Sequence, residues 1–325
     1  MRSRMSMTMT RRLICCLALL GLAALAIAQA TGQQATPLTL KTAGRGSSFM
    51  PYGEGVARFL AARNIIVEVK DSSGSNENLT AVDQSATTLG TAFLGSAYDA
   101  VHGLGWAAGH EHRNVRALFP MYETSFQVAA LRKSAISSLA DLDGKKVGVG
   151  PSKGPAEVFF RAAAGIAKIK PVIVTGDPAE LARQVLAGEI DALWQGAVVP
   201  IPPLSQIADK ADAVVFGLSD AEVAAMLQMF PQLSPTTIAG GTYKGQATGI
   251  KSVSSWNFVV ANKELPDEIA YAITKAIMSA IDPKSEIYPS AAGTLAKNAA
   301  TNRVMPFHPG AARYYAEAGI KLAAP

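Results

Sequence analysis

Residues 42–53 read Thr42-Ala43-Gly44-Arg45-Gly46-Ser47-Ser48-Phe49-Met50-Pro51-Tyr52-Gly53 and join an expected strand to an expected helix. Before this stretch, from Leu38 to Thr42, alternate residues are apolar, as in a strand. After it, from Val56 to Leu60, apolar residues recur at helical spacing. Glycines and serines at such a junction let the backbone turn tightly and aim free N–H groups at the helix N-terminus, where the dipole favours an anion. The stretch therefore predicts a strand–loop–helix unit that can hold an anion.

The same unit recurs along the chain. Polar loops follow three further apolar runs, at residues 71–76, 94–96 and 151–155, and each loop precedes a helical pattern. This alternation predicts a parallel sheet with crossover helices. Ligands of such sheets bind outside the carboxyl ends of the strands, which is where these loops would gather.

Later segments complete the expected sheet. We predict separate strands at Val115–Phe119 and Phe126–Leu131, the second a crossover, and a return strand at Ser255–Ala261. Asp177-Pro178 opens a helix that Gly188 closes. Pro266 opens an amphipathic helix and Pro309 opens the last one.

The first 30 residues are typical of an export signal. A basic start leads into an unbroken apolar run, Leu13–Ala28, and Ala28-Gln29-Ala30 has the small-x-small pattern of a cleavage site. The run is too short and wrongly flanked for a membrane span. The sequence thus predicts a periplasmic protein whose signal peptide is cleaved near Ala30.

The signal also accounts for the basic composition and for the cysteines. Of the 30 basic residues four precede position 31, and none of the 25 acidic ones does, so the remaining chain is nearly neutral. A neutral chain does not favour nucleic acid or a membrane surface as partner. Both cysteines, Cys15 and Cys16, lie in the apolar run, so no disulfide, thiolate metal site or cysteine nucleophile is expected in the exported protein.

Several segments together resemble the TAXI family, the solute-binding subunits of tripartite ATP-independent periplasmic (TRAP) transporters. Residues 46–53 resemble its GGTYYPxG signature and residues 73–79 its GGSxxN element. Residues 240–246 resemble its AGTYxGQ stretch, and residues 307–315 match its HPGAxxYY signature. The resemblance covers nearly all of residues 37–321.

This resemblance implies an α/β, two-lobed periplasmic-binding-protein fold of type II-like topology, with two crossover strands and a ligand cleft between the lobes. Lobe 1 is expected to comprise residues 31–125 plus 262–325, and lobe 2 residues 126–261. The protein would be a monomer without cofactor, metal or catalytic residue. It would bind a small organic anion, carboxylate or amino-acid-like, and deliver it to a TRAP transporter membrane subunit.

The expected ligand-binding residues come from the cleft loops and their neighbours. They are Arg45, Ser47, Ser48, Tyr52, Ser75, Asn78, Tyr98, Ser152, Lys153, Gly154, Gln195 and Tyr243.

The chain departs from the family pattern in the same loops. Phe49 and Met50 replace a pair of tyrosines, and Pro155 replaces a threonine. Arg45 and Lys153 are basic where the family more often has small or neutral residues. We therefore expect two additional charges near the ligand and do not carry ligand identity over from relatives.

Two other chemistries deserve comparison. Gly150-Pro151-Ser152-Lys153-Gly154 is a G-x-S-x-G sequence between strand and helix, and Asp191 and His308 follow in hydrolase order. The alternative function is therefore a secreted serine hydrolase using Ser152, although no oxyanion loop of the HGGG type precedes it. His110-Glu111-His112, with His102 nearby, suggests zinc but has no apparent third ligand.

The tail signature also has a structural interpretation. His308 before Pro309 is expected to cap and anchor the last helix. Tyr314 and Tyr315 are expected to pack that helix against the core, because one face of a terminal helix must be buried.

Overall fold

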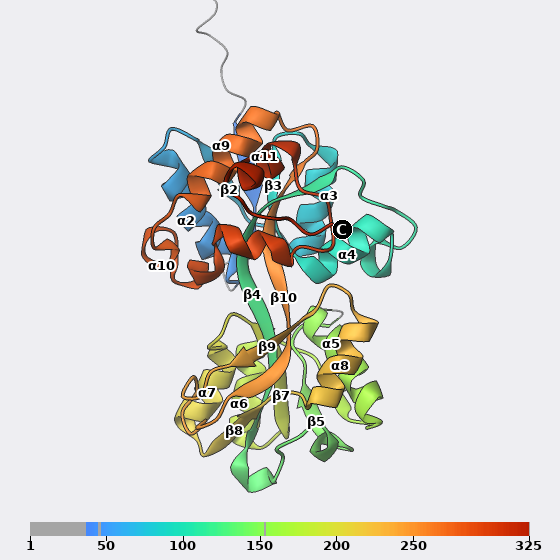
Figure 1. Cartoon of the computed structure of the whole chain (residues 1–325). Coiled ribbons are helices and arrows are strands. Elements are labelled where there is room, and N and C mark those ends of the chain that lie inside the picture. The colour runs from blue at the N-terminus through green and yellow to red at the C-terminus, as the bar shows by residue number, and fades with distance from the viewer. Residues whose placement is uncertain (1–36, 45–46, 153, 325) are drawn as a thin grey trace, which may run out of the picture. The chain divides into compact units, whose positions relative to one another are not determined.

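The computed structural model describes residues 37–44, 47–152 and 154–324. The described chain forms one mixed sheet of ten strands covered by helices (Figure 1). The strands are β1 Leu38–Lys41, β2 Val67–Lys70, β3 Thr88–Phe93, β4 Val115–Leu131, β5 Lys146–Gly148, β6 Val172–Val174, β7 Ala192–Ala197, β8 Ala213–Phe216, β9 Ser234–Ile238 and β10 Ile250–Asn262.

The helices follow the strands in the order that the polar loops predict. They are α2 Phe49–Ala61, α3 Ser75–Gln84, α4 Leu94–His102, α5 Pro155–Ala167, α6 Pro178–Ala187, α7 Pro202–Lys210, α8 Asp220–Met229, α9 Asp267–Met278, α10 Pro283–Glu286 and α11 Pro309–Glu317. Short 3-10 turns include η4 Pro289–Gly293.

A long antiparallel ribbon of β4 and β10 runs through the centre of the sheet (Figure 1). Its pairing extends from Ser254 beside Ser125 to Asn262 beside Val115. On one side β3 joins β10, followed by β1 and β2, and on the other side β7 joins β4, followed by β5 and β6. The short strands β8 and β9 pair with β4 and β10. The ribbon is therefore the only strand pair that both ends of the described sheet share.

We call the two ends the first and the second half of the sheet. The first half holds β1–β3 with α2–α4 and α9–α11, and the second holds β5–β9 with α5–α8 (Figure 1). Each half has apolar clusters on both faces of its strands. Of these strands β3 is buried on both faces, with five of its six residues buried.

Alternation along β10 shows which helices share a face. Val253 packs in the cluster of α5 and α8, whereas Val259 and Ala261 pack in the cluster of α2 and α9. All three are odd-numbered residues of one strand and point to the same side. We call this side the α2/α5 face; α3, α4, α6 and α7 cover the other.

One prediction about the elements was wrong, and the helix α7 was not predicted. β4 is one strand from Val115 to Leu131, not two, because Pro120 sits at a register shift beside Phe258 and costs the ladder little. The segment that begins as a proline-rich stretch at Val198 becomes α7, with Pro202 at its first position.

Predicted helix ends are confirmed where capping chemistry is strong. Asp177 caps α6 through bonds from Ala179 N and Glu180 N, and Gly188 ends the helix at φ 76°. His308 caps α11 by accepting a bond from Gly310 N. Tyr315 is buried and its hydroxyl donates to Leu118 O at 3.1 Å, so the tail helix is anchored to β4 as expected.

The end of α10 packs closely on α2. A Cβ added to Gly55, in the middle of α2, would stand 2.2 Å from the carbonyl oxygen of Ile287. A second helical glycine, Gly165 of α5, is exposed, and a Cβ there would meet nothing within 4 Å. Gly55 is thus buried against a neighbouring backbone, whereas Gly165 faces solvent.

This pair yields a stability prediction. Gly55→Ala should lower the free energy of unfolding by about 1–3 kcal/mol, since the methyl group must displace backbone. Gly165→Ala should raise it by about 0.5–1 kcal/mol, because alanine restricts the unfolded chain and favours the helix. Urea unfolding of both variants measures the two changes in the free energy of unfolding. Equal changes would mean that the end of α10 does not pack this closely on α2.

Candidate functional site

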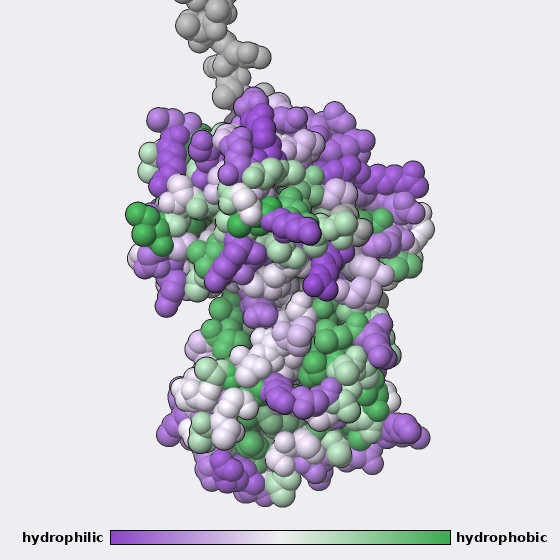
Figure 2. Space-filling view, viewed as in Figure 1, coloured by the Kyte–Doolittle hydropathy of each residue, from purple (hydrophilic) through white to green (hydrophobic). Residues whose placement is uncertain are grey.

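The carboxyl ends of β3 and β7 approach the middle of the ribbon from opposite directions. β3 ends at Phe93 beside Asn257, and β7 ends at Ala197 beside Ser125, whose partner on β10 is Ser254. The step from Ser254 to Asn257 spans about 10 Å of extended strand. The loops that follow these strands and their neighbours therefore meet over this stretch, which we call the ribbon midpoint. Figure 2 shows that the surface is indented where β4 and β10 pass between the halves.

Two helices begin on the same face on either side of the midpoint. α2 follows β1 with Ser48 at its N-cap position, and α5 follows β5 with Gly154 at that position. Ser48 makes no side-chain cap bond and Gly154 has no side chain to make one. In α2 Phe49 N donates to Ser47 Oγ at 3.2 Å, so the N–H groups that follow it in the first turn are the ones without a side-chain acceptor among the described residues. Both helices lie on the α2/α5 face. Helix N-termini of this kind attract an anion from both sides of one gap.

The loop before α2 is fixed to the ribbon by a buried tyrosine. The Ser48 hydroxyl bonds with the phenol of Tyr122 in β4, and burial raises the pKa of Tyr122 well above its usual value. Tyr52 meets the Tyr122 ring edge-on at 5.5 Å and its hydroxyl pairs with Thr294 Oγ1 at 2.8 Å. Burial also raises the pKa of Tyr52. Tyr52 thus packs beneath the loop, and its hydroxyl is bonded to Thr294 and not directed at a ligand.

Asn78 holds the ends of two strands together. It is fully buried, and its amide donates to Thr42 O at 2.6 Å and Thr91 O at 2.8 Å, after β1 and within β3. Its own oxygen accepts from Ser72 Oγ at 2.7 Å. Nearby, Ser75 Oγ accepts from Phe93 N at 3.0 Å. The expected second loop is therefore at the midpoint, but both side chains bond within the protein.

The second half contributes acceptors without partners. Gln127 of β4 and Gln195 of β7 lie opposite one another, and the buried Oε1 atom of each has no partner among the described residues. A Cβ on Gly150 would stand 3.1 Å from Gln195 Oε1, so this amide lies against the turn after β5. Ser152 is exposed in that turn. Buried acceptors of this kind fit a hydroxyl or ammonium donor.

An aromatic contact bridges the halves at the same level. The ring of Phe93, at the end of β3, lies 6.4 Å from Phe126 of β4 and 6.1 Å from Phe159 of α5. Val198, just after β7, packs against the cluster that contains Tyr122. Apolar contacts therefore flank the polar midpoint on the face where α2 and α5 begin.

Other expected site residues lie elsewhere. Tyr98 of α4 stacks on His102 at 4.3 Å. Tyr243, in the β9–β10 loop, is buried with α7, and its hydroxyl accepts from Ile201 N at 2.9 Å. Burial raises the pKa of Tyr243 to about 12. Arg45 and Lys153 lie outside the described residues, as does the expected signal peptide.

Sequence reasoning missed polar residues within the ribbon itself. Glu123 accepts bonds from Ser254 Oγ and Thr236 Oγ1. Asn257 is buried and donates to Tyr122 O and Thr124 Oγ1, each at 2.9 Å. The sequence did hold a signal for these residues. Four of residues 123–127 are polar, all except Phe126, within a strand that is otherwise mostly apolar.

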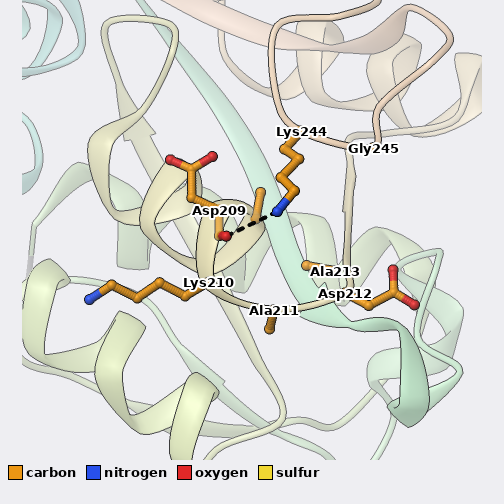
Figure 3. Close-up of a pocket in the computed structure, with 8 residues that line it drawn as sticks. Asp209, Lys210, Ala211, Asp212, Ala213, Lys244 and Gly245 are labelled. Carbon is orange, nitrogen blue, oxygen red and sulfur yellow. Dashed lines mark hydrogen bonds between the residues drawn. The ribbon is translucent and has the colours of Figure 1, made fainter.

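The described surface also has two depressions away from the midpoint. One, of about 360 Å³, is lined by residues 208–213 with Lys244 and Gly245 (Figure 3). Lys244 Nζ donates to Asp209 O at 3.2 Å across it, and the charged side chains around it point apart (Figure 3). The other, of about 340 Å³, is lined by His102, Gly103, Gly109, His110, Glu111 and Arg113. Along the described chain no helix has the length and apolar character to cross a bilayer.

The residues of the alternative hydrolase are not brought together. Ser152 follows the carboxyl end of β5, whereas Asp191 accepts from Lys146 N at the amino ends of β5 and β7. His308 is fully buried at the start of α11 in the first half, with Asp267 as its nearest carboxylate at 3.6 Å. A nucleophile, base and orienting acid must lie within hydrogen-bond reach, so this set is not a triad.

A family model covers most of the chain. Residues 40–319 match the model of the NMT1-like family. The chain belongs to the NMT1-like family. The family match spans β1 through α11 and so includes every element that borders the midpoint.

Three solved structures, one of them a solute-binding protein, share the fold of this NMT1-like protein. A TctC solute-binding protein from Polaromonas is 14% identical with a TM-score of 0.56, covering 88% of this chain and 99% of its own. Rpa4515 of R. palustris, solved with adipate, is 12% identical with a TM-score of 0.52, covering 80% and 88%. MatC of Rhodopseudomonas palustris, solved with malate, is 13% identical with a TM-score of 0.51, covering 77% and 87%. The periplasmic-binding-protein fold class predicted from the sequence is confirmed.

The placement of Tyr243 yields a prediction that separates stability from binding. Tyr243→Phe should lower the free energy of unfolding by about 1–3 kcal/mol, because Ile201 N would be left buried without its acceptor. The affinity for any ligand of the midpoint should change less than twofold. Thermal unfolding measures the stability of the variant, and calorimetric titration measures its ligand affinity. A large loss of affinity with unchanged stability would mean that the Tyr243 hydroxyl binds the ligand, as expected from the sequence.

Proposed function

We propose that this NMT1-like protein is an extracytoplasmic receptor that captures a small organic anion, a carboxylate or an amino-acid-like molecule. The observation that carries the proposal is the pair of helix starts at Ser48 and Gly154, on one face of the ribbon and on either side of its midpoint. A carboxylate between them would accept bonds from backbone N–H groups of both loops. Binding would then join the two halves of the protein.

Side chains in the two loops would add to the backbone donors. Ser47, Ser48 and Ser152 offer hydroxyls, and Arg45 and Lys153 would offer charge. Arginine can hold a carboxylate bidentately, whereas lysine acts as a point charge. We propose that Gln195 accepts from a donor on the ligand, since its Oε1 has no other described partner. The ligand would therefore carry a hydroxyl or ammonium group as well as a carboxylate.

The two halves would act as lobes that close on the ligand. We propose residues 31–125 with 262–325 as lobe 1 and residues 126–261 as lobe 2, hinged on the ribbon. Closure would bend β4 and β10 near the midpoint, a hinge motion of two elements. The uncapped helix starts would approach one another as the lobes close.

The finer assignment concerns the transporter. We propose that the chain is a TAXI-type subunit that delivers its solute to a TRAP membrane subunit, because the glycine-rich and tail signatures occur together. It would be exported to the periplasm, lose its signal peptide near Ala30 and act as a monomer. Neighbours of the same fold are titled as solved with malate and with adipate, which supports an organic acid as the solute.

The ligand class is open to a direct screen. Exported protein is heated with malate, adipate, glutamate and a neutral sugar, each in excess. A ligand at 100 times its Kd stabilises the folded state by about 2.7 kcal/mol, so the matching acid should raise the Tm clearly. The proposal is contradicted if the neutral sugar stabilises the protein and no carboxylate or amino acid does.

The positive charge in the loop before α5 yields a sharper prediction. If Lys153 meets the ligand, Lys153→Ala should raise the Kd of the organic acid found in the screen by about ten- to a hundredfold, or about 1.5–3 kcal/mol. The loss should appear in the dissociation rate and persist at moderate salt. Lys210→Ala removes an exposed lysine of α7 as control and should change the Kd less than twofold.

Calorimetry and stopped-flow measure these effects. A loss confined to the association rate and erased by salt would make Lys153 a charge at the rim of the site. The anion would then depend on the loop amides and serines alone.

A further inference from the structure

A cluster of metal-ligating side chains lies in the first half of the protein, on the face opposite to α2. Asp83 stands in the last turn of α3, and His110 and His112 stand in the loop between α4 and β4. One ligand atom from each of the three lies within 4.8 Å of the other two. The sequence places the two histidines together but gives no sign of Asp83, which is 27 positions before His110.

The pair of Asp83 and His112 already has the spacing of two zinc ligands. His112 Nδ1 lies 3.5 Å from Asp83 Oδ2, longer than an ordinary N–H···O hydrogen bond. His112 is 4% exposed, and its Nδ1 atom has no hydrogen-bond partner in the part of the chain that the structure describes. Ligand atoms at about 2.05 Å around a tetrahedral Zn²⁺ lie roughly 3.3 Å apart. The two atoms therefore need to move little to share one ion.

Neighbouring groups hold these two ligands in place. Asp83 Oδ1 accepts from Asn114 N at 2.8 Å, which leaves Oδ2 facing His112. The His112 ring packs against Trp106 at a tilt, with 5.2 Å between the ring centroids, and His112 N donates to Ala100 O at 2.8 Å. Such supporting contacts fix the orientation of ligand side chains before a metal arrives.

His110 can complete the set from the solvent side. Its ring is exposed and lies 4.8 Å from the His112 ring, edge to face. It borders the 340 Å³ depression, which leaves room for water as a fourth ligand. Arg113, on the same rim, is paired with Glu111 at 2.9 Å.

We propose that Asp83, His110 and His112 form a site for a late first-row transition metal, best suited to Zn²⁺, that is separate from the organic-anion site. Two imidazoles and one carboxylate are ligands that Zn²⁺ accepts, with a fourth position left for water. A bound ion would cross-link the carboxyl end of α3 to the loop that leads into β4. The proposal does not depend on the proposed transport function.

The test titrates tag-free, exported, chelator-treated protein with ZnCl₂ by calorimetry. We expect one Zn²⁺ per chain and a raised Tm. Titration with Co²⁺ should give the visible absorption of a tetrahedral complex. His110→Ala should weaken Zn²⁺ binding at least about tenfold, because the exposed ring can be removed without disturbing the core. Asp83→Asn keeps an acceptor for Asn114 but removes the charge, and should weaken binding to a similar degree.

His102→Ala is the matched control. This histidine is exposed on the same depression, bonds to Tyr98 O at 2.9 Å and is not part of the cluster. Its removal should change Zn²⁺ affinity less than twofold. The proposal is overturned if Zn²⁺ does not saturate at one per chain. It is also overturned if His102→Ala weakens binding as much as His110→Ala does.

Discussion

The antiparallel pairing of β4 with β10 is the constraint on which the rest of this structure depends. β3 attaches to one edge of this ribbon and β7 to the other, so the two parallel sets of strands are related only through it. Because each set meets the ribbon with its carboxyl ends toward the middle, the loops that follow β1, β3, β5 and β7 are directed to one region. The position of the ligand site that we propose thus follows from the strand pairing, because these loops meet at the ribbon midpoint.

The ribbon midpoint is polar in a way that suits a hinge. Apolar residues dominate both ends of β4 and residues 258–261 of β10, whereas Glu123, Ser254 and Asn257 occur at the midpoint. Their side chains bond to neighbouring strands, so the buried polar groups are satisfied without large apolar contacts. A segment with few apolar contacts bends at lower cost than a packed core. The Phe93 contact with Phe159 and the Val198 contact would have to slide when the halves move.

Much of the fold follows from local sequence patterns. The strand–loop–helix units and the caps at Asp177 and His308 depend on neighbours within a few residues, and they were predicted correctly. The continuity of β4 was missed because Pro120 is tolerated only by virtue of a register shift on β10, more than 100 positions away. α8 was missed although Ser219 and Glu222 form a capping box, because its apolar pattern is weak.

The site was predicted less completely, for the same physical reason. Asn78 and Tyr243 are polar residues in signature loops, but their bonds go to Thr42, Thr91 and Ile201, which no local pattern connects to them. Conversely, Tyr122 and Glu123 reach the midpoint only because β4 runs through it. Asp83, the third residue of the proposed metal site, was likewise beyond sequence reasoning, since a helix end and a distant loop meet only in the fold.

Closure about the ribbon is the central claim, and small-angle X-ray scattering tests it most directly. Exported protein is measured alone and with a saturating amount of the organic acid that stabilises it most. We predict a smaller radius of gyration with ligand, as two lobes close on an anion held between α2 and α5. An unchanged scattering profile at proven saturation would contradict the account and indicate a rigid site within one half.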